Sequence, residues 1–452
     1  MIPLVLKIAQ LFGIDRAVAY TLASRGWQII AGLITIIFIG HYLSPIQQGF
    51  YYTFSSILAL QVFFELGLTY VILQFASHEK ARLEWTLLRT LDGSEPAKER
   101  LSQLLHLSLR WYGIAALLMI VFIIPTGFIL FGKSPDAAHA GKWQFAWFWL
   151  VITTGSALFM SPVFAILEGC GLVADIARLR TTQDITAYLM FWLALFLGAG
   201  LLAVPVLQTI RVVISFLWLL RHYRSFIGAL TRPKDSTVPL SWWNEIWPMQ
   251  WRIALSWISG FFIFNLFNPI LFAYFGAAEA GKMGMSLSIA GALNLMSMTW
   301  VNTKIPMFGQ LVALKKFAEL DRLFFGMLKF ALVVSMAGGS VLMLILSLLR
   351  KYHVPLSERV LDPIPFGLLL ATAVVNVIVF SEAAYLRAYK EEPFLLNSLV
   401  GAIISALVCY VFGRSYGAIG MAYGYFGVTL LVGLTWATWV FRSKRKIWNT
   451  CC

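Results

Sequence analysis

Long runs of apolar residues, separated by short polar segments, recur along the whole chain. Each run is about 20 residues long, the length that a helix needs to cross the roughly 30 Å hydrocarbon layer of a bilayer. Strands of a membrane barrel would instead alternate polar and apolar residues in segments of about ten. The pattern therefore predicts spanning helices, since a helix satisfies its own backbone hydrogen bonds in lipid. We expect twelve spans, at 17–42, 49–75, 107–132, 143–167, 184–202, 203–222, 248–275, 281–308, 326–349, 362–388, 394–413 and 417–441.

The composition supports the same class of protein. The 452 residues are 60% hydrophobic and 12% charged, with a mean hydropathy of +0.78, whereas soluble domains are about 25% charged. The net charge of +14 is spread over many loops and not gathered in a patch or tail, so no nucleic-acid partner is expected. The cysteines (Cys170, Cys409, Cys451 and Cys452) lack metal-ligand spacing and the six histidines are scattered, so neither a metal nor a bound cofactor is expected.

Lysines and arginines predict the orientation of the spans, because short cytoplasmic loops retain these residues. With the N-terminus inside, 22 of the 35 fall in the tails and in the loops after even-numbered spans, and seven fall on the opposite face. Those seven are Lys133, Lys142, Lys282, Arg350, Lys351, Arg359 and Arg414. We therefore expect a multi-pass protein with both termini in the cytoplasm.

A polar segment at 223–247 divides the chain into two sets of six spans. We expect an N-terminal lobe at 1–222, a cytoplasmic linker at 223–247, and a C-terminal lobe with a basic tail at 248–452. Shifting the first half by 232 residues aligns "HYLSPIQQGFYYTFSSILAL" with "AYFGAAEAGKMGMSLSIAGAL", which places Gly49 on Gly281. Both halves begin inside, so the sequence predicts parallel repeats: two pseudo-symmetric six-helix bundles around a central cavity that holds the substrate.

Several charged residues fall inside the predicted spans, where a charge is expensive and usually functional. At 1.5 Å per residue, Arg25 lies roughly 12 Å and Glu65 roughly 15 Å from the cytoplasmic ends of their spans, so the two could also form a structural ion pair. Of the other cations, Arg211 lies near mid-membrane. The other charged residues inside predicted spans lie toward the cytoplasm. They are Arg252, Lys304, Glu382 and Arg387.

Five cations against two carboxylates give this set a positive surplus. A water-filled cavity with a surplus of positive charge suits an anionic substrate, above all one with phosphate groups. The alternative is that Arg252 and Arg387 reach the membrane surface by snorkelling. Glu65 and Glu382 are the deep carboxylates that could exchange a proton or a sodium ion. No reaction chemistry is evident, since the first outside loop, "HYLSPIQQ", has no carboxylate and no Walker lysine motif is present. We therefore expect a transporter and not an enzyme.

Three stretches resemble a known family. They are "LSPIQQGFYYTFSSILALQVFFELGLTYVILQFASHE" (43–79), "FAILEGCGLVADIARLR" (164–180) and "YLRAYKEEPFLLNSLVGAIISALVCYVFGRSYGAIGMAYGY" (385–425). They are similar to the Wzx-like polysaccharide flippases of the multidrug/oligosaccharidyl-lipid/polysaccharide (MOP) exporter superfamily. In the last stretch, Gly417, Gly420 and Gly424 fit a close helix crossing.

The resemblance implies a flippase of the bacterial cytoplasmic (inner) membrane. Its substrate would be undecaprenyl-pyrophosphate-linked oligosaccharide, moved to the periplasmic leaflet for O-antigen or other surface polysaccharide, with a polysaccharide polymerase among its partners. It also implies substrate-binding roles for cavity cations, here Arg25, Arg252, Lys304, Arg387 and Arg211. The alternatives are an ion-coupled multidrug or metabolite antiporter of the same superfamily and a membrane-embedded enzyme of envelope-glycan synthesis.

Overall fold

The computed structural model describes the backbone of residues 16–86, 89–230, 240–389, 391 and 393–450, and most of their side chains from Gly26 onward. Nearly all of this chain is helical, as expected of an all-α protein. The described strands form one small antiparallel hairpin, β1 (Leu83–Trp85) and β2 (Leu91–Gly93), which pairs Leu83 with Gly93. The fold class predicted from the apolar pattern is therefore confirmed.

Contacts divide the described chain into two compact units. Unit 1 contains the described residues up to Ala31 together with Leu58–Gly132 and Gly141–Trp257. Unit 2 contains Gly32–Ile57, Lys133–Ala140 and the described chain from Ile258 onward. Each unit therefore combines segments that lie far apart in the sequence. Two helices, α2 (Arg16–Tyr42) and α11 (Trp247–Phe264), pass from one unit to the other.

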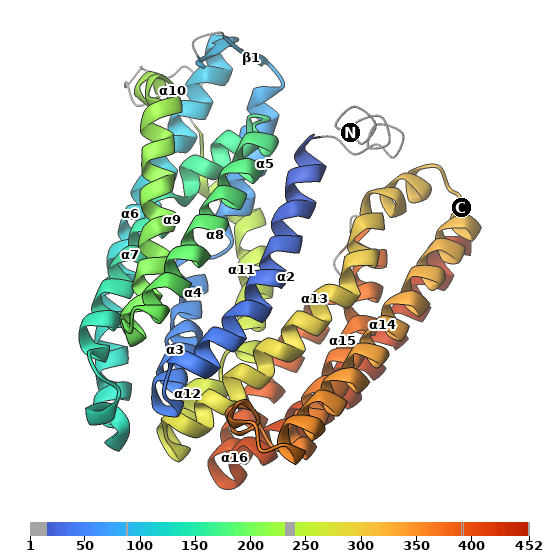
Figure 1. Ribbon diagram of the computed structural model, residues 1–452. Coiled ribbons are helices and arrows are strands. Elements are labelled where there is room, and N and C mark those ends of the chain that lie inside the picture. Colours follow the sequence, from blue (N-terminus) through green and yellow to red (C-terminus); the bar gives the residue numbers. More distant parts are fainter. Residues whose placement is uncertain (1–15, 87–88, 231–239, 390, 392, 451–452) are drawn as a thin grey trace, which may run out of the picture. The chain divides into compact units, whose positions relative to one another are not determined.

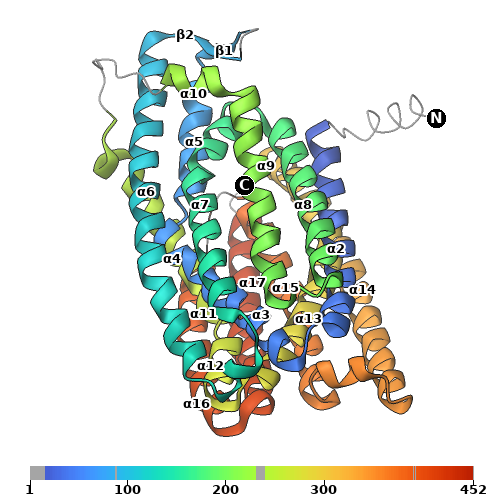
Figure 2. The same cartoon turned by 60° about the vertical axis from the view of Figure 1, so that its left-hand side comes forward.

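Unit 1 is a bundle of long helices in which α6 lies along α7 and α8 lies along α9 (Figures 1 and 2). Its helices are α4 (Val62–Glu65), α5 (Leu68–Lys80), α6 (Glu95–Gly132), α7 (Trp143–Gly169), α8 (Val173–Phe196), α9 (Ala203–His222) and α10 (Arg224–Leu230), with the short turns η1 (Ala59–Gln61), η3 (Gly200–Leu202) and η4 (Trp242–Ile246). The chain bends by 46° where α5 begins. Leu66 and Gly67 both adopt the left-handed conformation there, which interrupts the helical hydrogen bonding.

Unit 2 contains the second bundle, in which α13, α14 and α15 pack side by side (Figure 1). Its helices are α3 (Pro45–Leu58), α12 (Phe267–Phe275), α13 (Ala277–Ala313), α14 (Phe317–Lys351), α15 (Pro363–Arg387), α16 (Leu395–Val428) and α17 (Thr435–Thr450), with the turns η2 (Pro135–His139), η5 (Pro355–Arg359) and η6 (Thr429–Leu434). Gly417 has φ 62° and ψ −146°, so α16 is kinked at this residue. The kink coincides with the predicted start of the last span at 417.

The predicted spans coincide with these helices, but not all of them are strongly apolar. Seven helical stretches of the described chain are long and apolar enough to cross a membrane, and eight if the bent pair at α5 forms one span. One of the seven, Leu395–Trp448, is 54 residues long and contains the last two predicted spans on either side of the Gly417 kink. Helices α8 and α13 do not meet the same test, because charged, hydroxyl and glycine residues lower their hydropathy.

Within unit 2, glycines bring α3 and α13 into close contact. A Cβ atom on Gly49 would overlap the carbonyl oxygen of Ala277, and one on Gly281 would lie 2.9 Å from the Gly49 nitrogen. Beside them, the buried amide of Gln48 donates hydrogen bonds to the carbonyl oxygens of Gly281 (2.8 Å) and Arg359 (3.0 Å). Small residues at a crossing let two backbones approach in this way. Helix α3 is therefore held tightly against α13.

Candidate functional site

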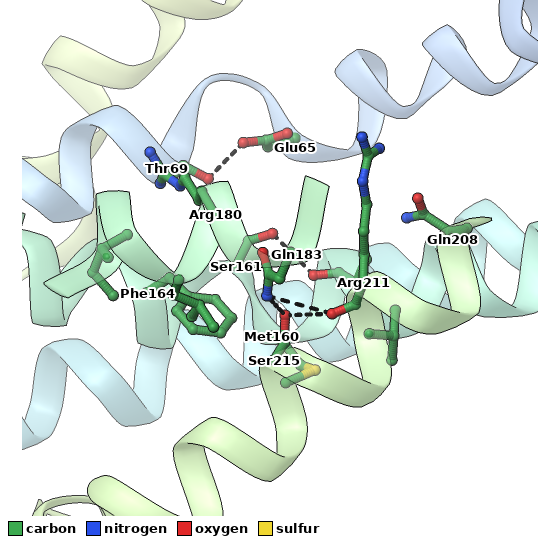
Figure 3. Close-up of a pocket in the computed structure, with 14 residues that line it drawn as sticks. Glu65, Thr69, Met160, Ser161, Phe164, Arg180, Gln183, Gln208, Arg211 and Ser215 are labelled. Atoms are coloured by element: carbon green, nitrogen blue, oxygen red, sulfur yellow. Dashed lines mark hydrogen bonds between the residues drawn. The ribbon is translucent and has the colours of Figure 1, made fainter. Parts of the chain in front are cut away.

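Unit 1 contains an open polar cavity of about 300 Å³ between the bent α4–α5 segment and helices α7, α8 and α9. Figure 3 shows Glu65 and Thr69 on one wall, facing the side chains of α8 and α9. The lining residues are Glu65, Thr69, Ala157, Met160, Ser161, Phe164, Ile176, Leu179, Arg180, Gln183, Gln208, Arg211, Val212 and Ser215. Eight of these fourteen are polar or charged, which is unusual for a surface at membrane depth and marks the cavity as the candidate site.

Arg211, on α9, is held in place by an acidic partner on α8. Its guanidinium forms an ion pair with Asp184 at 2.7 Å and lies 5.6 Å from the centre of the Tyr188 ring. The second carboxylate oxygen of Asp184 accepts a hydrogen bond from Gln28 of α2 at 3.1 Å. Asp184 is buried, so its charge is neutralised by Arg211 and not by water.

Hydrogen bonds between α8 and α9 fix the floor of the cavity. The buried amide of Gln183 donates to the hydroxyl oxygen of Ser215, and the Ser215 hydroxyl donates to the backbone carbonyl of Arg211 at 2.8 Å. Figure 3 shows the Gln183 and Ser215 side chains beside the Arg211 backbone carbonyl, with the Arg211 side chain extending away from them. Because α8 and α9 also pack along their length, the position of Arg211 is set by its helix and by its partner together.

Glu65 ends α4 just before the bend, and its environment depends on that break. Its carboxylate accepts a hydrogen bond from the hydroxyl of Thr69, which in turn lies 2.6 Å from the hydroxyl oxygen of Tyr112. The left-handed turn at Leu66 and Gly67 brings Thr69 to the same side as Glu65. This short chain of hydroxyl groups places one carboxylate on the cavity wall with its partners supplied by α5 and α6.

The second arginine of the cavity, Arg180, also has an acidic partner. It donates to Glu168 at the end of α7, at 2.8 Å. The cavity is thus lined by two arginines and one glutamate, with two further carboxylates bonded to the arginines. Two arginines therefore face three carboxyl groups, so this cavity has no positive surplus.

The cavity brings together two of the residues that the sequence singled out, Glu65 and Arg211. The side chain of Arg25 lies outside the described residues. Lys304 and Arg387 are exposed on α13 and α15, and Arg252 is exposed on α11, with its guanidinium 5.6 Å from the centre of the Trp251 ring. The roles assigned to these cations remain predictions.

Glu382, the other deep carboxylate, lies in unit 2. It is 4% exposed on α15 and accepts a hydrogen bond from Thr438 of α17 at 3.0 Å. It is therefore separate from the unit 1 cavity, in a contact between neighbouring helices.

Asp184 was missed in the sequence because the fifth span was expected to begin at this residue. The helix begins at Val173, eleven residues earlier, so Asp184 lies well inside α8. A signal was nevertheless present. From the shared turn between α8 and α9, Asp184 lies roughly 18 Å along one helix and Arg211 roughly 12 Å along the other, depths at which a long arginine side chain can reach a carboxylate.

Comparison with solved structures identifies the fold. No protein-family model matches the chain, and no curated protein matches it. Among solved structures, an inward-facing multidrug resistance MATE family transporter of the MOP superfamily is similar over 98% of both chains, with 16% identity and a TM-score of 0.64. The lipid II flippase MurJ, in an inward closed conformation, is similar over 94% of this chain and 87% of its own, with 11% identity and a TM-score of 0.66.

A third similar structure is a MOP superfamily transporter from Pyrococcus furiosus, described by a binding pocket of reverse polarity. It covers 95% of both chains, with 16% identity and a TM-score of 0.56. These likenesses show the fold. The chain is a multi-pass helical membrane protein, and its fold is that of MATE transporters and of the flippase MurJ.

Proposed function

We propose that this protein is a MOP superfamily flippase that moves undecaprenyl-pyrophosphate-linked oligosaccharide from the cytoplasmic to the periplasmic leaflet of the bacterial inner membrane. The observation that carries the proposal is the fold shared with a lipid II flippase along 94% of the chain. The three stretches that resemble Wzx-like flippases add support from the sequence. Both termini would be cytoplasmic, and a polysaccharide polymerase would receive the product.

The physical problem for such a protein is the headgroup. A polyprenyl tail can stay in lipid, but a pyrophosphate with its sugars costs far too much to pass through hydrocarbon without polar partners. In the proposed mechanism the headgroup enters a polar cavity between the two lobes, and movement of the lobes exposes it to each face in turn. Arg25, Arg252, Lys304 and Arg387 would bind the pyrophosphate, with Arg211 nearer the sugars, and Glu65 or Glu382 would couple transport to a proton or sodium gradient.

The proposal is tested by replacing Arg25 with alanine in a strain that lacks its flippase. Loss of a phosphate-binding cation should stop surface glycan display, because each charged hydrogen bond contributes about 1.5–3 kcal/mol. Arg110→Ala is the matched control, since Arg110 is exposed on α6 and does not line the unit 1 cavity. Immunoblots of membrane fractions verify that both variants insert. Normal glycan with Arg25→Ala would remove Arg25 from the mechanism, and absence of glycan with the unmodified protein would contradict the proposed function.

One observation favours a second function. In the unit 1 cavity three carboxyl groups outnumber two arginines, and Glu65 lies on the wall, an arrangement that would also suit an ion-coupled multidrug or metabolite antiporter. Inverted vesicles distinguish the two: an antiporter would move a fluorescent cationic dye into the lumen when a proton or sodium gradient is imposed. A flippase would leave the dye in place and translocate a labelled lipid-linked glycan.

A further inference from the structure

We infer that the unit 1 cavity binds a neutral sugar of the lipid-linked headgroup, and that the pyrophosphate binds elsewhere. This inference rests on the proposed function and names the part of the substrate that this cavity recognises. It follows from three properties of the described cavity: the arginines are already paired, an amide without a partner faces the space, and the volume fits a small part of a glycan.

The paired arginines argue against a phosphate in this cavity. Arg211 is bonded to Asp184 at 2.7 Å and Arg180 to Glu168 at 2.8 Å, so each guanidinium already has a carboxylate beside it. Glu65 adds a third carboxyl group on the wall. A phosphate here would have to compete with three acidic groups for two cations, and like charges in one site repel one another.

Amide and hydroxyl groups remain available in the same cavity. Gln208, on α9, makes no hydrogen bond to any part of the chain that the structure describes, and Figure 3 shows its amide beside Arg211 with no dashed line. Ser161 lies on the opposite wall. The Ser161 hydroxyl donates to the Ala157 carbonyl at 3.1 Å, so its oxygen remains as an acceptor. The Gln208 amide offers two donors and one acceptor oxygen, and together these groups match the donors and acceptors of a sugar ring.

The apolar wall and the size complete the match. Phe164 and Met160 face the space beside Ser161, so one side can pack against the C–H face of a sugar. A volume of about 300 Å³ is at the small end for ligand sites. It corresponds to about ten water molecules. The cavity therefore accommodates one or two sugar rings and not a whole oligosaccharide.

The test measures protection of a cysteine placed in the cavity. Ser161→Cys is introduced into the full chain after the native cysteines have been replaced by serine, and its labelling by a maleimide is followed in membranes. Two probes are compared: the neutral repeat oligosaccharide released by mild acid from the host's lipid-linked glycan, and inorganic pyrophosphate. We expect the oligosaccharide to slow labelling and pyrophosphate to have no effect at equal concentration.

The side chain that recognises the sugar is tested in the same assay. Gln208→Ala should raise the oligosaccharide concentration needed for half-protection about tenfold, which corresponds to the loss of one or two good hydrogen bonds. Gln310→Ala, an exposed glutamine on α13, is the matched control and should change nothing. Circular dichroism and thermal melting of each variant exclude unfolding as the cause.

Two outcomes would overturn the inference. Protection by pyrophosphate at least as strong as that by the oligosaccharide would make the cavity an anion site. Absence of any protection, in a strain where the unmodified protein still exports glycan, would remove the cavity from substrate binding while leaving the proposed function intact. Failure of the unmodified protein to export glycan would instead contradict the proposed function itself, so the two failures are distinguishable.

Discussion

Arg211 and Asp184 form the contact on which the cavity of unit 1 depends. Their ion pair joins α8 to α9, and Gln28 extends it to α2. The Arg211 side chain is one-third exposed and the Asp184 side chain 12% exposed, so water screens the pair only in part. Removing either charge leaves the other without compensation in a poorly hydrated place, which is costlier than removing both. The pair should therefore behave as one unit in mutagenesis.

We predict that Asp184→Asn destabilises the protein by about 2 kcal/mol, the amount typical of a lost charged hydrogen bond. Arg211→Gln should have a similar effect, and the double variant should lose clearly less than the sum of the two, because the partners are in direct contact. Thermal unfolding in detergent measures all three. Glu84→Gln, on the exposed hairpin, is the control and should melt like the unmodified protein. Strictly additive losses would show that the pair contributes no coupling.

Only some residues of the candidate site could be predicted from the sequence. Glu65 and Arg211 stand out in the sequence because each is a charge inside an apolar run, and both line the cavity. Asp184 and Arg180 do not stand out, because they lie in a stretch whose many polar residues resemble a loop. The pairing of carboxylates with arginines depends on how α8 is rotated relative to α9. Tertiary packing sets that rotation, so the pairing cannot be predicted from one segment of the sequence.

At the scale of elements, the contact between α3 and α13 has a simple origin in the sequence repeat. Gly49 and Gly281 are equivalent under the shift of 232 residues, and in unit 2 they touch one another. Equivalent residues of two repeats meet only near the axis that relates them, so the predicted repeat would place its axis close to this crossing. The repeat itself remains a prediction, and the contact was not foreseen from it.

We predict that Gly49→Ala disrupts this crossing. The added Cβ atom would overlap the Ala277 carbonyl, a rigid backbone group, so α3 must move away at a cost of about 1–3 kcal/mol. Gly291→Ala is the matched control, since this glycine lies on α13 with no atom within 4 Å of its added Cβ. It should leave stability unchanged or raise it by about 0.5–1 kcal/mol. Thermal melting of the two variants in detergent makes the comparison. Equal stability of the two variants would show that the close approach is unimportant.

Most elements followed from the apolar pattern, and the exceptions have physical reasons. The runs located the helices because burial in lipid demands about 20 apolar residues wherever the chain crosses. The extension of α6 back to Glu95 was not predicted, since its first two turns are amphipathic and contact the hairpin region of unit 1. The hairpin at 83–93 was likewise unforeseen. It is stabilised from outside, by the indole of Trp85 donating to the Cys170 carbonyl at 2.9 Å.

At the scale of the whole chain, unit 2 joins segments from both halves of the sequence. Residues 44–57 and 133–140 of the first half contact residues 268–281 and 355–361 of the second. The lysine and arginine count predicts that all four segments lie at the outside ends of their spans. Among the connections, Asp136 accepts a hydrogen bond from the Ala277 amide at 2.8 Å. If transport requires the two halves to separate at this face, these contacts must break in every cycle.

We therefore predict that a covalent bond across these segments stops transport. Ser56 and Asn268 are buried, and their side chains are 3.0 Å apart, so cysteines at both positions can be joined by a short thiol-specific crosslinker. With the native cysteines replaced, crosslinking should abolish glycan export, and reduction should restore it. Each single cysteine variant, treated identically, should stay active. Full export by the crosslinked protein would mean that these segments remain together throughout the cycle, and movement would then have to occur elsewhere in the chain.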